Sequence, residues 1–340
     1  MYFEVKNENP QELRVYRNEN VDKRPVLFTM IGLPGSGKST IADNLVVERN
    51  TGEYSRPVIH SSDSLRKELF GKEGTQGDNG MIFSELHKRM KQDLKDGKDV
   101  VFDATNINKK FRINFIRELK NIDCFNVAVC VMTPYELCLK NNVSRERVVP
   151  ENVIRSMYLK WCPPSKQEGF DDIVLCYSFG DIDVKAKYNL HNFFGGEINA
   201  CSIEQENRHH KRTIGDHCIQ AAVNIIYLCP DNYNLYLAAL LHDIGKPFTK
   251  SHLNAKGEET NECHYYNHQH CGAYDSLFYT YNLSPNEDEM IHIANLIYYH
   301  MHPFLSWKQS EKALKRDRDL LGEDFFNEVM LLHRADRTAQ

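Results

Sequence analysis

The sequence predicts two domains: an α/β domain, in which helices cover both faces of a parallel sheet, followed by an all-α domain. Three observations carry this prediction. Short apolar runs alternate with amphipathic segments as far as residue 178, a glycine-rich loop follows the first of these runs, and helical periodicity dominates after residue 206. The length of 340 residues suits two domains of ordinary size, each with its own core.

Changes of pattern along the chain set the expected boundaries. Residues 1–24 form a polar leader, residues 25–178 the α/β domain, residues 179–205 a glycine-containing linker and residues 206–340 the helical domain. The expected strands of the α/β domain are Val26–Ile31, Val58–His60, Val100–Phe102, Val127–Met132 and Ile173–Cys176. The expected helices of the second domain are Ile219–Leu228, Leu235–Leu241, His270–Thr280, Glu287–Tyr299 and Asp324–Leu332.

Composition excludes several classes of protein. The net charge of −5 and the pI of about 6.3 give no global basic field, so any contact with nucleic acid has to be local. The ten cysteines form no C-x-x-C pair, and their positions in apolar runs favour buried thiols in a reducing cytosol. Because no apolar run approaches the length of a membrane span, we expect a cytoplasmic protein without membrane contact.

The most specific motif is the loop G-L-P-G-S-G-K-S-T, which fits G-x-x-x-x-G-K-[ST] and follows an apolar run directly. Its glycines let backbone N–H groups turn toward a polyphosphate, and the following helix adds positive potential. Lys38 is expected to reach the β and γ phosphates of ATP, and the Ser39 hydroxyl to bind Mg²⁺. The residues expected to bind ATP are Gly32, Gly35, Ser36, Gly37, Lys38, Ser39 and Thr40.

Charged residues follow the next strands, at the edge of the sheet where ligands gather. Asp63 and Arg66 lie three positions apart at the start of a helix, so a carboxylate and a guanidinium share one face. Asp63 is a candidate general base for a hydroxyl, or alternatively a helix cap. Asp103 follows the third strand and is a candidate metal-orienting or acceptor-binding carboxylate, or a structural turn residue.

A lid-like segment, N-V-S-R-E-R-V-V-P from Asn142, contains Arg145 and Arg147. Either arginine is placed to neutralise charge on a transferring phosphate, and a solvated charge run is the alternative.

Together these residues resemble the 5′-kinase module of phage and bacterial polynucleotide kinases, over residues 25–178. The resemblance implies that Asp63 is the general base on a 5′-hydroxyl, that Arg66 grips the neighbouring acceptor phosphate and that Arg145 contacts the donor phosphates. Arg145 lies five residues before Pro150, one fewer than in the phage pattern, so Arg147 stays an alternative. Zeta-toxin-like and small-metabolite kinases share much of this pattern, and the acceptor therefore stays open.

Histidines concentrate in the second half of the chain. Of the 15 histidines, all except His60 and His87 occur after residue 190. His242 and Asp243 lie at the end of an apolar helix. Adjacent His and Asp side chains at such a helix end can bind one divalent ion if other helices supply further ligands. The full candidate set is His217, His242, Asp243, His268, His300 and Asp336. We expect His191, His252, His264 and His292 to be ordinary surface or core residues.

This set resembles the HD superfamily of metal-dependent phosphohydrolases, over about residues 205–340. The resemblance implies that His217, His242, Asp243 and Asp336 hold a first metal and that His268 and His300 complete a second. Mn²⁺, Ni²⁺ or Co²⁺ suits such imidazole-rich sites. Lys246 and His210 are candidate phosphate contacts. The basic run from Arg208 to Arg212 could follow an RNA backbone, and a solvated run is equally expected.

The pairing of the two modules resembles bifunctional RNA end-healing enzymes, in which an HD domain accompanies a polynucleotide kinase, although the order of the modules is reversed here. This resemblance implies phosphorylation of 5′-hydroxyl RNA ends and hydrolysis of 2′,3′-cyclic or terminal phosphates, with an RNA ligase acting afterwards. DNA ends are a further possible acceptor. The alternatives are a metabolite or nucleotide kinase fused to a nucleotide hydrolase, and a kinase with a non-catalytic, RNA-binding HD module. The oligomeric state stays open.

Overall fold

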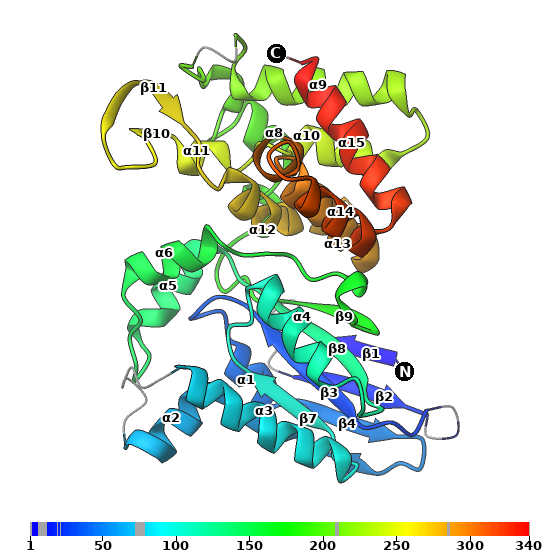
Figure 1. Ribbon diagram of the computed structural model, residues 1–340. Helices are drawn as coiled ribbons and strands as arrows, with labels where there is room; N and C mark the ends of the chain where they lie inside the picture. Colours follow the sequence, from blue (N-terminus) through cyan, green and yellow to red (C-terminus); the bar gives the residue numbers. More distant parts are fainter. Residues whose placement is uncertain are drawn as a thin grey trace. The chain divides into compact units, whose positions relative to one another are not determined.

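The computed structural model divides into two compact units (Figure 1). The first unit comprises Met1–Met157 and Glu168–Asp181, and the second comprises Tyr158–Gln167 and Ile182–Gln340. The structure describes residues 2–5, 12–18, 20, 22–71, 79–207, 211–283 and 286–339. Residues 72–78, and residues 208–210 of the predicted basic run, lie outside the described residues.

A five-stranded parallel sheet forms the centre of the first unit, in the order β6-β7-β3-β8-β9. The strands are β3 (Val26–Ile31), β6 (Val58–Ser61), β7 (Val100–Asp103), β8 (Phe125–Met132) and β9 (Asp172–Tyr177). Every residue of the central strand β3 is buried, as expected for a parallel strand covered on both faces. The sheet confirms the predicted α/β fold.

The helices of this unit are α1 (Lys38–Asp43), α2 (Ser62–Phe70), α3 (Asn79–Lys95), α4 (Lys109–Glu118), α5 (Tyr135–Val143) and α6 (Glu151–Tyr158). Alternate residues of β3 pack into two separate cores. Leu27 packs with Leu86 of α3 and Phe115 of α4, whereas Phe28 packs in a core with α1 and with residues near the N-terminus. The helices therefore place the carboxyl end of β3 and the loop after it at the edge of a rigid sheet.

A second sheet, in the order β1-β2-β4-β5, takes its first two strands from the region expected as a leader and the other two from the expected α/β domain. Its strands are β1 (Tyr2–Val5), β2 (Leu13–Arg17), β4 (Val46–Arg49) and β5 (Tyr54–Ser55). Leu13, Val15 and Arg17 are buried while Arg14 and Tyr16 are half-buried, so β2 has the alternation of a strand with one face on a core. Residues 13–17 therefore form a strand of the folded unit and not part of a polar leader. The sequence pattern did not indicate this strand, because many of the neighbouring residues are charged.

A buried ion pair joins this second sheet to the central one. Arg17 Nη1 lies 3.2 Å from Asp99 Oδ1, and the same oxygen accepts a hydrogen bond from the Val26 backbone N–H at 2.8 Å. The start of β3 is fixed by this contact.

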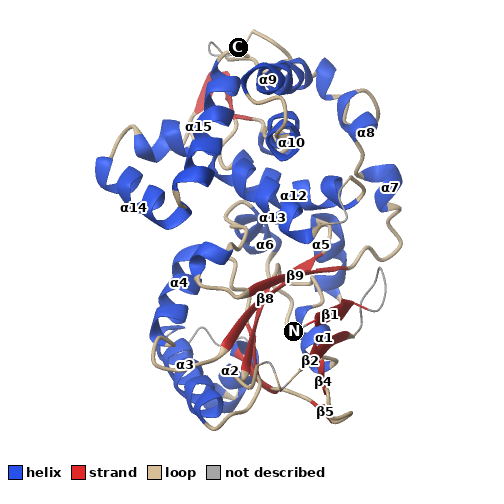
Figure 2. Ribbon diagram, turned by 90° about the vertical axis from the view of Figure 1, so that its right-hand side faces the viewer, coloured by secondary structure: helices blue, strands red, loops and turns tan. Residues whose placement is uncertain are grey.

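The second unit is mostly helical (Figure 2). Its helices are α7 (Val184–Lys187), α8 (Leu190–Phe194), α9 (Ile214–Leu228), α10 (Tyr233–Leu241), α11 (Lys246–Thr249), α12 (His268–Tyr281), α13 (Glu287–Tyr299), α14 (Glu311–Leu321) and α15 (Glu323–Arg337). Two strands, β10 (Ser251–Leu253) and β11 (Glu259–His264), form an antiparallel hairpin that the sequence prediction did not include. The hairpin is polar, and therefore lacks the apolar alternation by which strands are recognised.

Two further segments differ from the expected organisation. The predicted linker contains α7 and α8, whose first turns are capped by the side chains of Asp183 and Asn189. Tyr158–Gln167 belongs to the second unit, where the Tyr158 hydroxyl donates a hydrogen bond to Asp275 Oδ2 at 2.6 Å and Trp161 is fully buried. The chain therefore enters the second unit once before it returns to form β9. Within the described part of the chain, no helix has the length and apolar character needed to cross a membrane.

Candidate functional sites

The first candidate site is the loop between β3 and α1. Gly35 has φ 81° and Gly37, the residue before α1, has φ 93°, a conformation that favours glycine. A Cβ atom at Gly35 would also collide with the backbone carbonyl of Cys138 in α5. The α5 region fixes the loop in return, because Asn141 Nδ2 donates to the Gly35 carbonyl at 3.0 Å and Thr133 Oγ1 donates to the Ser36 carbonyl at 2.8 Å.

Polar groups in and beside this loop fit a nucleotide phosphate and its magnesium ion. Lys38 Nζ donates to the Leu33 carbonyl at 2.7 Å inside the loop. The buried Ser36 hydroxyl has no hydrogen-bond partner among the described residues, so it is available to a phosphate oxygen. Ser39 Oγ donates to Asp103 Oδ2 at 2.9 Å, which brings together the two oxygens expected to hold Mg²⁺ directly or through water. Gly32 and Thr40 belong to the same loop and first helical turn.

Burial lowers the pKa of Lys38 to about 8, although the carboxylate of Asp103 opposes this shift. A lysine with this pKa loses its charge as the pH rises through about 8, whereas phosphate binding favours the charged form. We therefore expect ATP to bind with uptake of a proton at alkaline pH, and its affinity to fall about tenfold between about pH 7 and about pH 9. Calorimetric titrations in buffers of different ionisation enthalpy measure both quantities. An affinity that stays constant across this range would show that the charge of Lys38 is not needed.

The second group of residues surrounds the carboxylate of Asp63. Ser61 caps α2 by accepting a hydrogen bond from the Asp63 backbone N–H at 3.3 Å, so the Asp63 side chain is not used as the cap. Asp63 Oδ1 lies 3.0 Å from Arg66 Nη1 and 2.6 Å from Arg147 Nη1, and Asp63 Oδ2 lies 3.8 Å from Arg145 Nη2. Three guanidinium groups thus converge on the carboxylate proposed as the base.

The lid segment is fixed at its base by Asn142. The Asn142 amide donates to the Val149 carbonyl at 2.8 Å and accepts from the Val149 N–H at 3.0 Å, which closes the turn that carries both lid arginines. The charges of Asp103, Arg145 and Asp63 all act on the pKa of Lys38. The structure therefore brings Lys38, Asp63, Arg66, Asp103 and Arg145 together, and it adds Arg147 on the side of Asp63.

One buried ion pair beside this site was not predicted. Arg112 in α4 binds Glu168 through two bonds of 2.8 Å, and both side chains are almost fully buried. Arg112 Nη1 also donates to the Asn106 carbonyl at 3.0 Å, and Asn106 Nδ2 donates to the Met30 carbonyl at 2.9 Å. The pair thereby fixes the turn after Asp103. A single sequence offers no signal that links residues 56 positions apart.

The other candidate site lies in the helical unit, where the six predicted ligands come from five helices or helix ends. His217 lies in α9, His242 and Asp243 follow α10, His268 begins α12, His300 follows α13 and Asp336 lies in α15. All six are 6% exposed or less.

Backbone carbonyls orient the four imidazoles. The Nδ1 atoms of His242, His268 and His300 lie 2.7, 2.7 and 2.6 Å from the carbonyls of the residue three positions earlier, and His217 Nδ1 lies 3.4 Å from the Ala339 carbonyl. These contacts suit Nδ1 as the N–H donor, and they direct the Nε2 atoms of the four histidines toward the other candidate ligands. The Nε2 atoms of His217 and His242 are 3.2 Å apart, and those of His268 and His300 are 3.1 Å apart.

Asp243 connects the two pairs of histidines. Its Oδ2 lies 3.3 Å from His242 Nε2 and 3.5 Å from His217 Nε2, whereas its Oδ1 lies 3.3 Å from His268 Nε2. Asp336 Oδ1 lies 3.0 Å from His217 Nε2. Two groups with metal-ligand spacing result, and both contain Asp243. The donor set fits divalent cations, and Asp243 is the one residue that both groups share.

The electrostatics of these side chains suit a cation site. Burial disfavours a charged His242, but Asp243 and Asp336 outweigh burial and raise its pKa to about 10. Burial likewise opposes ionisation of Asp243, but His242 and Lys246 keep its pKa well below the ordinary value. The site therefore attracts positive charge, which bound cations would supply in place of the proton.

Lys246 lies beside this centre and is itself buried. Its Nζ lies 2.6 Å from Asp243 Oδ2 and donates to Gln205 Oε1 at 2.7 Å. The predicted phosphate contact at His210 falls outside the described residues, as does much of the basic run that contains it.

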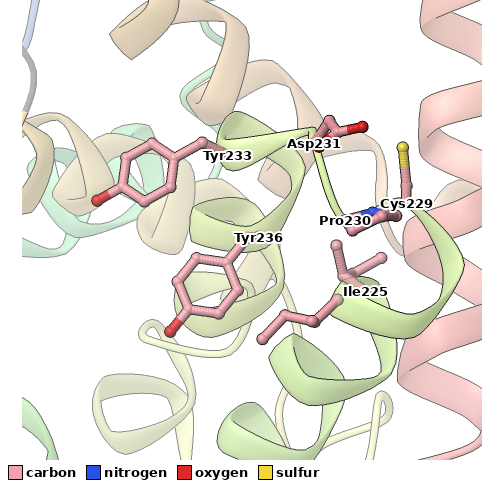
Figure 3. Close-up of a pocket in the computed structure, with 7 residues that line it drawn as sticks. Ile225, Cys229, Pro230, Asp231, Tyr233 and Tyr236 are labelled. Atoms are coloured by element: carbon pink, nitrogen blue, oxygen red, sulfur yellow. The ribbon is translucent and has the colours of Figure 1, made fainter.

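A pocket of about 330 Å³ opens near the junction of α9 and α10 (Figure 3). Its lining is mainly apolar and aromatic and includes Ile225, Tyr233 and Tyr236. None of the predicted site residues lines it.

Comparisons with known proteins match the two parts of the chain that contain these candidate sites. Residues 27–164 match the family described as AAA domain, and residues 214–340 match the HD domain family. The chain therefore has a region similar to P-loop kinase-like domains, followed by a region similar to HD domains. Such domains imply ATP with Mg²⁺ in the first and divalent metal in the second.

Three curated relatives are each 26% identical to this chain over their aligned regions. They are L-seryl-tRNA(Sec) kinase of Methanococcus maripaludis over 151 residues, Protein kti12 of Schizosaccharomyces pombe over 157 residues and Transcription factor bHLH140 of Arabidopsis thaliana over 185 residues. The alignments cover 43%, 43% and 51% of this chain, and 56%, 54% and 18% of the respective relatives. A solved structure of a candidate kinase from Chloroflexus aurantiacus aligns with TM-score 0.37 and 13% identity over 48% of this chain and 92% of that one.

Proposed function

We propose that the chain phosphorylates 5′-hydroxyl ends of RNA with ATP and hydrolyses 2′,3′-cyclic or terminal phosphates in its HD domain. One observation carries the kinase half of this proposal. The Asp63 carboxylate is not used as a helix cap and lies among Arg66, Arg145 and Arg147, close enough to Lys38 to act on its pKa. A base surrounded by guanidinium groups suits a hydroxyl acceptor that carries a neighbouring phosphate.

In the proposed reaction, Asp63 accepts the proton of the 5′-hydroxyl as its oxygen attacks the γ-phosphorus, and the bond to the β–γ bridging oxygen breaks to release ADP. Arg66 binds the acceptor phosphate, and Lys38 with the loop N–H groups binds the donor phosphates. Ser39 and Asp103 would hold Mg²⁺, which neutralises phosphate charge. Phosphates of bound substrates would replace Asp63 as partners of the guanidinium groups.

The two lid arginines are expected to differ in effect. The charge of Arg145 acts on the pKa of Lys38, which supports a role for Arg145 on the donor side, whereas Arg147 makes the shorter contact with Asp63. We expect Arg145→Ala to lower the kinase rate more than Arg147→Ala, because an arginine directed at developing phosphate charge contributes several kcal/mol. Steady-state kinetics of both variants, with exposed Arg117→Ala as the control, measure the difference. Equal losses, or a larger loss at Arg147, would reverse the assignment.

In the HD domain, His217, His242, Asp243 and Asp336 would hold one cation, and His268 and His300 would share Asp243 to hold a second. Cations bound there would polarise a phosphoryl oxygen and activate a water molecule. The Lys246 ammonium group would stabilise the negative charge of the leaving phosphate or of the Asp243 carboxylate. Because most ligands are imidazoles, Mn²⁺, Ni²⁺ or Co²⁺ is expected to support hydrolysis better than Mg²⁺.

The similarity to a protein named L-seryl-tRNA(Sec) kinase supports a hydroxyl acceptor borne on RNA. Two alternatives remain, and they differ from the proposal in the phosphate acceptor of the kinase or in the activity of the HD domain. A small-metabolite or nucleotide kinase fused to a nucleotide hydrolase would not use oligonucleotides, and a non-catalytic HD module would bind RNA without hydrolysing it. A downstream RNA ligase and a cytoplasmic location follow from the RNA-repair reading and stand as proposals with it.

A comparison of acceptors tests the proposal. Matched 5′-hydroxyl RNA, 5′-hydroxyl DNA and a nucleoside 3′-monophosphate are offered with ATP, and both ends of the products are chromatographed. We expect phosphorylation of RNA to exceed that of the mononucleotide, together with loss of a 2′,3′-cyclic phosphate when Mn²⁺, Ni²⁺ or Co²⁺ is present. Phosphorylation of the mononucleotide that an excess of oligonucleotide does not inhibit would favour the metabolic alternative.

A further inference from the structure

We infer that Glu206, His252 and Cys263 form a separate metal site, here called the hairpin site, which binds Zn²⁺ or a cation of similar coordination preference. The inference does not depend on the proposed function, and the hairpin site shares no residue with the HD centre. It replaces the expectation that His252 is an ordinary surface residue.

Three potential ligand atoms form a nearly equilateral triangle. His252 Nε2 lies 3.5 Å from Cys263 Sγ and 3.6 Å from Glu206 Oε2, and Cys263 Sγ lies 3.7 Å from the same Glu206 oxygen. Ligand atoms of a tetrahedral zinc ion, bound at the usual distances for sulfur, nitrogen and oxygen, are separated by about 3.3–3.6 Å. The triangle therefore matches one face of such a tetrahedron.

Three different segments supply the ligands. His252 comes from β10, Cys263 from β11 and Glu206 from the chain before α9 (Figure 1). The Cys263 backbone N–H donates to the Glu206 carbonyl at 2.9 Å, so backbone pairing already holds two ligands in place. The Glu206 carboxylate is divided between two tasks, because Oε1 pairs with Lys250 while Oε2 is the oxygen that faces His252 and Cys263.

The chemistry of these side chains favours zinc. A thiolate, an imidazole and a carboxylate are all zinc ligands, and the thiolate disfavours Mg²⁺ and Ca²⁺. The Cys263 thiol releases its proton to solvent when the metal binds. Cys263 is buried, but the side chains of Glu206 and His252 are 46% and 54% exposed, so the fourth position is open to water. This exposure also gives the ion a route of entry.

The position of the site gives the ion a structural role. Glu206 follows Gln205, whose side chain accepts the hydrogen bond from Lys246 beside the HD centre. A cation at the hairpin site would fasten the hairpin to the segment that positions Lys246. We therefore expect the ion to order this segment without taking part in either reaction.

Cobalt spectroscopy of the full chain tests the inference, because a sulfur-to-cobalt charge-transfer band reports thiolate coordination. The protein is stripped with a chelator, reduced and titrated with Co²⁺. A second stripped and reduced sample is loaded with Zn²⁺, and the bound Zn²⁺ is counted by elemental analysis. We expect the band in the parent and in His242→Ala, which impairs the HD centre, and its loss in Cys263→Ser. His252→Ala, a change at an exposed side chain, should weaken the band at a Co²⁺ concentration that saturates the parent.

Cys229→Ser is the matched control, since Cys229 is a partly exposed cysteine of the same unit. This variant should keep the band, and circular dichroism establishes that each variant is folded. Absence of the band in the parent, or its persistence in both Cys263→Ser and His252→Ala, would overturn the hairpin site. Either outcome leaves the kinase and HD proposals untouched, because neither uses these residues.

Discussion

Asp63→Ala is expected to lower the rate of phosphoryl transfer by about 10²–10⁴, with little change in the affinity for ATP. The reason is that Asp63 acts on the acceptor hydroxyl, whereas the donor phosphates are held by the loop and Lys38. Single-turnover kinetics measure the rate, and equilibrium binding of ATP measures the affinity.

Two other variants serve as comparisons in this experiment. Glu68→Ala removes an exposed carboxylate from the same helix, α2, and should leave the rate near that of the parent. Lys38→Ala should also abolish transfer, but through the donor, with weaker ATP binding. If Asp63→Ala transfers phosphate at the parental rate, Asp63 is not the base.

Asp243→Ala is expected to reduce HD-dependent hydrolysis to background, because both groups of candidate ligands contain this carboxylate. Kinase activity should stay near normal. Hydrolysis of a 2′,3′-cyclic phosphate and of a terminal phosphomonoester, each measured with Mn²⁺, Ni²⁺, Co²⁺ and Mg²⁺, tests the expectation. Metal content by elemental analysis should fall in parallel with activity.

Removal of a buried charge can also unfold a protein, since it leaves Lys246 without its carboxylate partner. Asp243→Asn therefore serves as a second variant that keeps the volume of the side chain, and Asp319→Ala as an exposed control in α14. Full hydrolysis by a folded Asp243→Asn protein would contradict the bridging role.

The parts of both sites that are local in sequence were predictable. The loop after β3 requires glycines and a lysine in consecutive positions, so its motif is readable without a structure. The α/β fold followed from buried runs that alternate with helices. The six candidate metal ligands lie far apart in sequence, and they were predicted because His242 and Asp243 are adjacent at the end of an apolar helix and because the order of the whole set resembles that of the HD superfamily.

The parts that depend on contacts distant in sequence were not predictable. Arg112 and Glu168 look like ordinary charged residues until the fold buries them against each other. The hairpin site joins positions 206, 252 and 263 through strands too polar to show alternation. Tyr158–Gln167 likewise carries no signal that it belongs to the second unit, because its buried aromatic residues would suit either core.

The most direct test of two separate catalysts uses one RNA that carries a 5′-hydroxyl and a 2′,3′-cyclic phosphate. The parent, Lys38→Ala and Asp243→Ala proteins each receive this RNA with ATP, Mg²⁺ and one transition metal, and both ends are analysed. We expect Lys38→Ala to process only the 3′ end, Asp243→Ala to phosphorylate only the 5′ end, and a mixture of the two to restore both products. Loss of 5′ phosphorylation in a folded Asp243→Ala protein would contradict the account and indicate one composite site.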